Sequence, residues 1–244
     1  MKTKYIRHLF SAAVAMIPFS GASGQTIIQH LGATDPVTAG FTLSSTGDVQ
    51  LGPVFGDLGF DSWKIHSRIT IESATYNYFL MPAEREAAMT DGWMMSANTR
   101  FVEASDAAFV IMSFATETRR FRLRISAIDN GELVVSGDAI HPFSFEGDAL
   151  GYHEYALVYD PLLDEAALWI DGIVRVTGIS GATVPSASPY FIFGASGEGI
   201  THSHWNEASF AIIPEPATVA LLTGMVALLA TGILRRRRAN PVEE

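Results

Sequence analysis

The chain has 244 residues, a formal net charge of −10 at pH 7 and no cysteine. Without cysteine there can be no disulfide bond, thiol nucleophile, thiolate zinc site or iron–sulfur cluster. The excess of acidic residues argues against nucleic acid as a partner, because binding to phosphate groups needs a basic surface. The length suits one β domain together with targeting segments.

The first 24 residues have the pattern of a secretory signal peptide. Three basic residues lie between Met1 and His8, an apolar stretch follows from Leu9 to Phe19, and small residues extend from Ser20 to Gly24. The apolar stretch is short for a permanent membrane anchor, and the small residues satisfy the rule for signal-peptide cleavage. We therefore expect the secretion machinery to export the chain and cleavage to leave Gln25 as the first residue.

Residues 25–213 have the pattern of an all-β domain. Residues 25–47 are rich in glycine, threonine and serine, which predicts an N-terminal arm or an irregular first strand. From residue 48 to residue 213, short apolar runs are separated by turn residues, which predicts a two-sheet antiparallel sandwich. One short helix is expected at Ala83–Met89, and no pattern predicts a helix long enough for a βαβ arrangement.

Alternating residues predict which side chains face the core. Residues 63–71 alternate between polar and apolar, and Arg120, Arg122 and Arg124 alternate with three apolar residues. Because successive side chains of a strand point to opposite faces, we expect the three arginines to lie together on an outer face.

Trp169 is predicted to lie on an outer face as well, because Leu168 and Ile170 on either side of it would face the core. The Asp171-Gly172 pair that follows favours a type I′ turn between two strands. Trp169 and the three arginines are therefore the candidate ligand surface, suited to an acidic polysaccharide or a protein partner. Sugars could also stack on the other tryptophans, for which packing in the core is the alternative: Trp63, Trp93 and Trp205.

Five segments carry a resemblance to a known family of sandwiches: Gly92–Ala97, Tyr152–Pro161, Ala167–Gly172, Phe193-Gly194 and Trp205. Their order resembles that of the laminin-G-like, concanavalin-A-like jelly roll. The resemblance implies a jelly-roll sandwich over residues 48–213. The family includes glycan binders, protein-binding modules and hydrolases, so the fold leaves the activity open.

Catalytic acids of the glycosidase type are not evident. Glycoside hydrolysis needs two carboxylates across a cleft, and the hydrolytic relatives carry Glu, Asp and Glu close together on one strand. This chain has no such string. The nearest groups are Asp164-Glu165 in a predicted turn and Glu84 with Glu86 on the predicted helix. We interpret both as solvated surface charge.

The sequence offers candidate ligands for two kinds of metal site. His202 and His204 would lie on one face of a strand, with Glu207 close behind, and such a set could bind zinc, but no further ligand follows at motif spacing. A structural calcium ion would instead use loop carboxylates and carbonyls. The candidate carboxylates, among which the spacing selects no set, are Asp57, Asp61, Asp129, Asp138 and Asp160. No other cofactor is expected, and His153 is interpreted as a strand residue that packs or hydrogen-bonds near Tyr152 and Glu154.

The last thirty residues predict a membrane-sorting signal. Pro214-Glu215-Pro216 precedes an uncharged apolar run, Ala217–Leu234, which Arg235-Arg236-Arg237-Arg238 follows directly. The run is just long enough to span a bilayer as a single helix. Because positive residues stay in the cytoplasm, residues before Pro214 are expected outside and residues 239–244 inside.

This arrangement resembles the PEP-CTERM sorting domain of Gram-negative bacteria, in which an exosortase, a membrane-embedded processing enzyme, reads the tripeptide and removes the helix. The resemblance implies that residues 214–238 anchor the chain transiently in the inner membrane with the body in the periplasm, before release to the cell surface or the extracellular space. Without both ends, nine basic and 23 acidic residues remain, a net charge of −14.

Together these features favour an exported, surface-sorted, non-enzymatic protein of the bacterial envelope or extracellular matrix that binds polysaccharide or a protein partner. Two alternatives stay open. One is a glycan-active hydrolase with unrecognised catalytic acids, and the other is a passive structural matrix protein.

Overall fold

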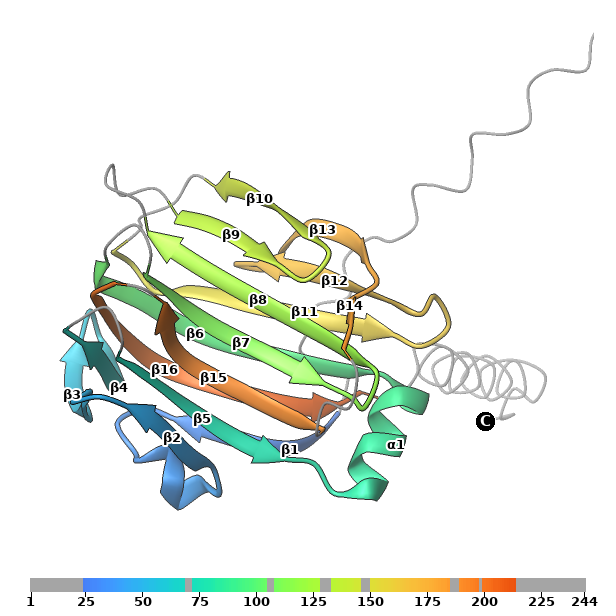
Figure 1. The fold of residues 1–244 in the computed structure, drawn as a ribbon, viewed down its shortest axis with the longest axis horizontal. Helices are drawn as coiled ribbons and strands as arrows, with labels where there is room; N and C mark the ends of the chain where they lie inside the picture. The colour runs from blue at the N-terminus through green and yellow to red at the C-terminus, as the bar shows by residue number, and fades with distance from the viewer. Residues whose placement is uncertain are drawn as a thin grey trace, which may run out of the picture. The chain divides into compact units, whose positions relative to one another are not determined.

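The computed structural model describes residues 24–68, 72–104, 108–127, 133–145, 150–184, 189–197 and 199–213 (Figure 1). The predicted signal peptide, the Pro-Glu-Pro tripeptide, the apolar run 217–234 and the arginine cluster lie outside these residues. Within the described ranges, no helix is both long enough and apolar enough to cross a membrane.

Two antiparallel sheets form a sandwich, which confirms the all-β sandwich of the predicted fold class (Figure 1). Sheet A has the strand order β13-β12-β11-β6-β16-β4-β3, and β1 also pairs with β16. Its strands are β1 (Gln25–Leu31), β3 (Gln50–Asp57), β4 (Phe60–Ser67), β6 (Trp93–Ala104), β11 (His153–Asp160), β12 (Glu165–Ile170), β13 (Ile173–Ile179) and β16 (Thr201–Ile212).

Sheet B has the order β10-β9-β8-β7-β15-β5-β2, with β14 paired to β8. Its strands are β2 (Thr42–Thr46), β5 (Ser73–Phe79), β7 (Ala108–Ala115), β8 (Arg119–Ala127), β9 (Leu133–Gly137), β10 (Ile140–Phe145), β14 (Ala182–Thr183) and β15 (Tyr190–Gly197). Two short helices accompany the sheets, the 3-10 helix η2 (Pro36–Ala39) and α1 (Pro82–Asp91). Helix α1 lies where Ala83–Met89 predicted it.

The segment 25–47 is part of the sandwich, which therefore begins at Gln25 and not at residue 48. Strand β1 pairs with the second half of β16, with Gln25 opposite Ile212, and β2 pairs with β5. Ile28 and Phe41 from this segment are buried in the core. The turn-rich composition hid these strands, because they are short and separated by the turn around η2.

The predicted alternation is confirmed in the described residues, including residues 63–68, while residues 69–71 lie outside them. In β8 the apolar residues between the arginines are fully buried, while the arginines are only partly buried. Leu168 and Ile170 are likewise buried and Trp169 points to the opposite face. Asp171 and Gly172 have φ angles of 51° and 73°, and two successive positive φ angles are the mark of the type I′ turn.

Asp171 also joins two of the segments that carry the jelly-roll resemblance. One of its carboxylate oxygens lies 2.7 Å from Nδ1 of His153, and the other accepts the backbone N–H of Glu154 at 3.0 Å. His153 therefore reaches across to the β12–β13 turn, a contact that sequence spacing did not predict. The pair holds the start of β11 against that turn.

Aromatic side chains fill the space between the sheets. Trp93 stacks on Tyr159 at a centroid distance of 5.4 Å and meets Phe114 and Phe121 edge-on. Trp63, Trp93 and Trp205 are all buried, so core packing, and not sugar stacking, is their role. In the segment Phe193-Gly194, a Cβ atom on Gly194 would lie 2.2 Å from the carbonyl oxygen of Ala74, which explains why glycine stands there.

His30 places an ionisable group in this core. Its ring stacks on Phe193, and its Nε2–H donates to the carbonyl oxygen of Trp205 at 3.3 Å. Burial lowers the pKa of His30 to about 4, against the smaller raising effect of that hydrogen bond. The imidazole is therefore neutral in the folded protein at pH 7.

The His30→Gln variant tests this assignment. Below pH 6.5 the unfolded chain takes up a proton at His30 that the folded chain takes up only near pH 4. The free energy of unfolding therefore falls as the pH drops through this window, by about 3 kcal/mol from this group. Urea unfolding followed by tryptophan fluorescence should show a fall between pH 7 and pH 4 that is smaller by that amount in the variant. The exposed-histidine control His141→Gln should keep the wild-type slope; equal slopes in all three proteins would contradict the assignment.

Candidate functional site

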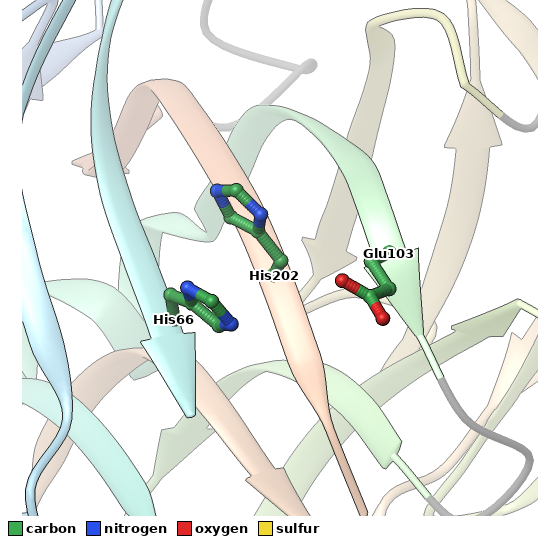
Figure 2. A group of neighbouring side chains, drawn as sticks. All are labelled: His66, Glu103 and His202. Atoms are coloured by element: carbon green, nitrogen blue, oxygen red, sulfur yellow. The ribbon is translucent and has the colours of Figure 1, made fainter. Parts of the chain in front are cut away.

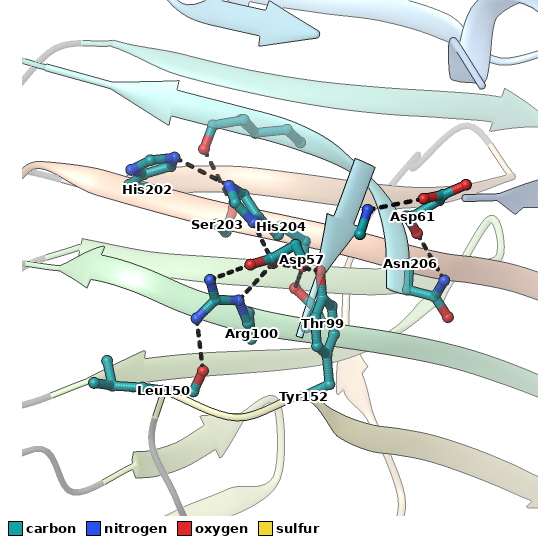
Figure 3. A network of polar contacts seen from close by, with 12 residues as sticks. Asp57, Asp61, Thr99, Arg100, Leu150, Tyr152, His202, Ser203, His204 and Asn206 are labelled. Carbon is teal, nitrogen blue, oxygen red and sulfur yellow. Dashed lines mark hydrogen bonds and ion pairs between the residues drawn. The ribbon is translucent and has the colours of Figure 1, made fainter. Parts of the chain in front are cut away.

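A network of polar side chains covers part of the outer face of sheet A, the face turned away from sheet B. Asp57, at the end of β3, accepts hydrogen bonds from Nε and Nη2 of Arg100 at 2.7 and 2.6 Å. Its Oδ2 atom also accepts from Nδ1 of His204 at 2.6 Å and from the hydroxyl of Tyr152 at 2.9 Å. Figure 3 shows how donors from β6, β16 and the segment before β11 converge on this one carboxylate.

Asp57 and Arg100 form a fixed ion pair. Their side chains are only 12% and 13% exposed. Burial by itself would raise the pKa of Asp57, but the hydrogen bonds from Arg100, His204 and Tyr152 outweigh it and hold the pKa far below its usual range. Burial opposes the charge of Arg100 as well, and Asp57 more than compensates, so that the pKa of Arg100 is raised. Both groups are therefore charged at pH 7.

The network extends from Asp57 through two imidazoles. A carboxylate can only accept, so Nδ1 of His204 carries the proton that is donated to Asp57. Burial lowers the pKa of His204 despite the opposing effect of Asp57. Burial, with smaller effects of the imidazoles of His66 and His204, lowers the pKa of His202 to about 4. In neutral His204, Nε2 is then an acceptor, and Nε2 of His202, 3.2 Å away, donates to it. With Nε2 of His202 as the hydrogen-bond donor, the lone pair of the neutral His202 ring is on Nδ1.

His202 also belongs to a second group, with His66 and Glu103 (Figure 2). One potential metal-ligand atom from each residue lies within 4.8 Å of the others. The rings of His66 and His202 stack with centroids 4.4 Å apart. Burial, aided by Arg68 and Lys64, lowers the pKa of His66, so both imidazoles are neutral at pH 7 and can offer lone pairs.

The sequence located only part of this group. His202 and His204 do share the outer face of β16, as predicted, but Glu207 is not near them in the network and instead accepts from Nε2 of Gln29 at 3.1 Å. The further ligands come from β4 and β6, which flank β16 in the sheet. Alternation over residues 63–71 placed His66 on a polar face, but strand pairing between distant segments cannot be read from spacing.

The aspartates proposed for calcium are engaged elsewhere. Asp57 lies in the network above, and Asp138 accepts from Arg120 at 2.6 Å and from Arg122 at 2.8 Å. Asp61 and Asp160 accept the backbone N–H groups of Gly56 and Leu162. Asp129 lies outside the described residues. Within the described part of the chain, the metal-capable group of three contains none of these aspartates.

The candidate surface of Trp169 and the arginines is divided between two faces. Trp169 lies on the outer face of sheet A, whereas Arg120, Arg122 and Arg124 lie on the outer face of sheet B. Asp138 pairs with the first two arginines, and the guanidinium of Arg124 lies 4.9 Å from the ring centroid of Phe109. The four residues therefore do not form one binding site.

The acidic pairs weighed as catalytic groups have structural contacts. Glu84 accepts the backbone N–H of Met81 at 2.8 Å and so caps helix α1, and it also accepts the hydroxyl of Tyr78. Asp164 forms an ion pair with Arg119 and accepts the hydroxyl of Tyr159 at 2.7 Å.

Exposed apolar side chains lie beside the Asp57 network. In the hairpin between β3 and β4, Phe55 is 73% exposed and Leu58 62%. Phe60 lies 4.9 Å, centroid to centroid, from Tyr152. Leu150 is also exposed, and its carbonyl oxygen accepts from Nη1 of Arg100 at 2.8 Å. We call these five residues the hairpin cluster. In the sequence, the apolar residues around Gly56 and Gly59 are the one feature that could have indicated the hairpin cluster.

Solved structures with a similar fold assign the chain to the class of β-sandwich domains. No family model matches the chain, and no curated protein matches it in sequence. Among solved structures, the similar ones are β-sandwich domains of the jelly-roll type.

One is a structure of botulinum neurotoxin type C, described as dependent on two ganglioside molecules for cell entry (TM-score 0.54, 12% identity, 82% of this chain and 50% of that one). Another is a carbohydrate esterase from the Shiga toxin-encoding bacteriophage phi24B (0.54, 12%, 78% and 99%). A third is the binding domain of botulinum neurotoxin DC with rat synaptotagmin II (0.52, 14%, 78% and 48%). The chain spans about half the length of the neurotoxin domains, and at these identities the likeness concerns the fold alone.

Replacement of Asp57 by Asn should destabilise the fold, because it leaves Arg100 nearly buried without a counter-charge. Removal of one partner of such a pair costs about 3 kcal/mol or more, and urea unfolding at pH 7 measures the loss. The control Asp61→Asn changes an exposed acid in the same hairpin and keeps an oxygen acceptor for Gly56, so it should change stability by less than about 0.5 kcal/mol. Equal stability of the two variants would contradict the role given to Asp57.

Proposed function

We propose that the protein is an exported, non-enzymatic component of the bacterial envelope or extracellular matrix that binds polysaccharide through the outer face of sheet A. The observation that carries the proposal is the hairpin cluster. Exposed apolar groups that adjoin one another and are flanked by polar groups mark binding surfaces, and aromatic residues and arginine are enriched where proteins make contacts. Here the ring of Tyr152 donates to Asp57 and lies under the guanidinium of Arg100, the ring of Phe60 packs against Tyr152, and Phe55 is exposed in the same hairpin.

The arrangement suits a sugar ligand in particular. The exposed rings of Phe55 and Phe60 offer apolar faces, while the ion pair and Tyr152 offer polar atoms that could orient hydroxyl groups. Two of the proteins with a similar fold are a botulinum neurotoxin whose cell entry depends on two ganglioside molecules and a carbohydrate esterase, which adds support from analogy of fold. The structural contacts of Glu84 and Asp164 support their interpretation as non-catalytic residues.

A double variant tests the surface. The full-length chain in detergent is incubated with extracellular polysaccharide from the cells that produce it, and binding is measured by surface plasmon resonance. Phe55→Ala with Phe60→Ala should weaken binding at least about tenfold, because aromatic anchors dominate binding energy. The matched control, Phe79→Ala with Met81→Ala, removes equally exposed apolar groups near α1 and should bind normally.

Three outcomes would count against this surface: no binding of polysaccharide by the wild-type chain, equal loss in both double variants, or release of reducing sugar. The last would favour the hydrolase alternative. Normal folding without any ligand, together with an altered matrix when the gene is deleted, would favour the passive structural role.

Export and tail processing form a separate part of the proposal, supported by the signal-peptide pattern and the resemblance of residues 214–238 to PEP-CTERM signals. Replacement of Pro214, Glu215 and Pro216 by alanine should leave the chain in the inner membrane fraction with an uncleaved tail, because an exosortase would no longer recognise it. Immunoblots of cell fractions measure size and location. The control Asn240→Ala with Pro241→Ala should be processed normally, and identical fractionation of both variants would contradict this route.

A further inference from the structure

His66, His202 and Glu103 lie in one cross-strand row. In the register of sheet A, His202 of β16 is directly opposite His66 of β4 on one side and Glu103 of β6 on the other. Directly opposed residues on one face have Cβ atoms about 4.5–5.5 Å apart, which is why their side chains meet. Figure 2 shows the three side chains on these neighbouring strands. The row is thus built on paired strands and not on loops.

The donor set suits a transition metal. Two imidazoles and a carboxylate are ligands that Zn²⁺ accepts at about 2.0–2.2 Å in tetrahedral geometry, which would bring ligand atoms about 3.3 Å apart. The observed spacing is within 4.8 Å, so ion binding requires the side chains to close in and the stacked rings of His66 and His202 to tilt until their in-plane lone pairs converge. Ca²⁺ prefers six to eight oxygen ligands, so the row does not suit the calcium ion considered from the sequence.

A second layer of residues orients the row. Metal-bound histidines commonly donate their other ring N–H to a neighbouring acceptor, which fixes the tautomer. Nε2 of His202 has such an acceptor in Nε2 of His204, and His204 in turn donates to Asp57 (Figure 3). The lone pair on Nδ1 of His202 is thereby kept for a metal ion. His66 and His202 are half-buried and Glu103 is exposed, so an ion can enter from solvent.

We propose that His66, His202 and Glu103 bind one divalent transition-metal ion, with Zn²⁺ preferred over Ca²⁺, and that His204 is a positioning residue for His202. Three protein ligands leave a fourth position for water or an oxygen atom of a ligand. This site is distinct from the hairpin cluster, and its test does not depend on polysaccharide binding.

The test uses the untagged full-length chain in detergent, stripped of metal with a chelator. Isothermal titration with Zn²⁺ alone should give one site per chain with a dissociation constant on the order of 1 μM or tighter, and Ca²⁺ should give no heat of binding. Titration with Co²⁺ should produce the visible absorption bands of a four-coordinate ion. The exposed-histidine variant His141→Ala, on sheet B, should match the wild type.

Variants in the row should lose the ion. His66→Ala, His202→Ala and Glu103→Gln should each weaken Zn²⁺ binding by about a hundredfold or more, since each removes one of three ligands. Glu103→Gln changes only an exposed side chain, so this variant keeps the test valid if a histidine variant fails to fold. His204→Ala should weaken Zn²⁺ binding 10- to 100-fold, keep a stoichiometry of one and shift the Co²⁺ bands.

Several results would overturn the proposal. They are Zn²⁺ binding weaker than about 100 μM in the wild type, Ca²⁺ binding as tight as Zn²⁺ binding, or Zn²⁺ binding that survives in Glu103→Gln and His66→Ala. A His204→Ala variant with unchanged affinity and Co²⁺ spectrum would remove the positioning role alone.

Discussion

The carboxylate of Asp57 is the contact on which the outer face of sheet A depends. It accepts four hydrogen bonds, from Arg100, His204 and Tyr152. Each of these donors comes from a different part of the chain, so one buried charge ties the β3–β4 hairpin to β6, to β16 and to the segment before β11. The same contact sets the tautomer of His204 and, through it, the nitrogen of His202 that carries a lone pair. The hairpin cluster and the histidine row therefore share one support.

Local patterns in the sequence predicted much of the sandwich. Alternation assigned the faces of β8 and β12 correctly, and Asp171-Gly172 predicted its turn, because both signals act over a few neighbouring residues. The residues of the candidate site were harder to predict from the sequence. His66 and Glu103 become neighbours of His202 only through strand pairing between distant segments, and no periodicity records that register. The split between Trp169 and the arginines has the same origin, since alternation shows that a side chain faces outward but not from which sheet.

The two outer faces differ in how they handle charge. On sheet B, buried Asp138 accepts from Arg120 and Arg122, so one of the three positive charges of the arginine stripe is balanced within the fold. On sheet A, the Arg100–Asp57 pair is also internally balanced, but it is bordered by exposed rings and by neutral imidazoles. Partly buried groups without net charge favour ligands that bind through apolar faces, hydroxyl oxygens or a metal ion. They attract ligands of high net charge less strongly.

The pairing of Gln25 with Ile212 has a geometric consequence. The first and last strands of the sandwich bring the two ends of the domain to the same rim, the end of β16 opposite to His202. Ile212 is ten positions after His202 in β16, a distance of about 33 Å at the rise of an extended strand. The chain therefore begins its first strand and ends its last strand at one rim of the sandwich, and the histidine row lies toward the other end of β16.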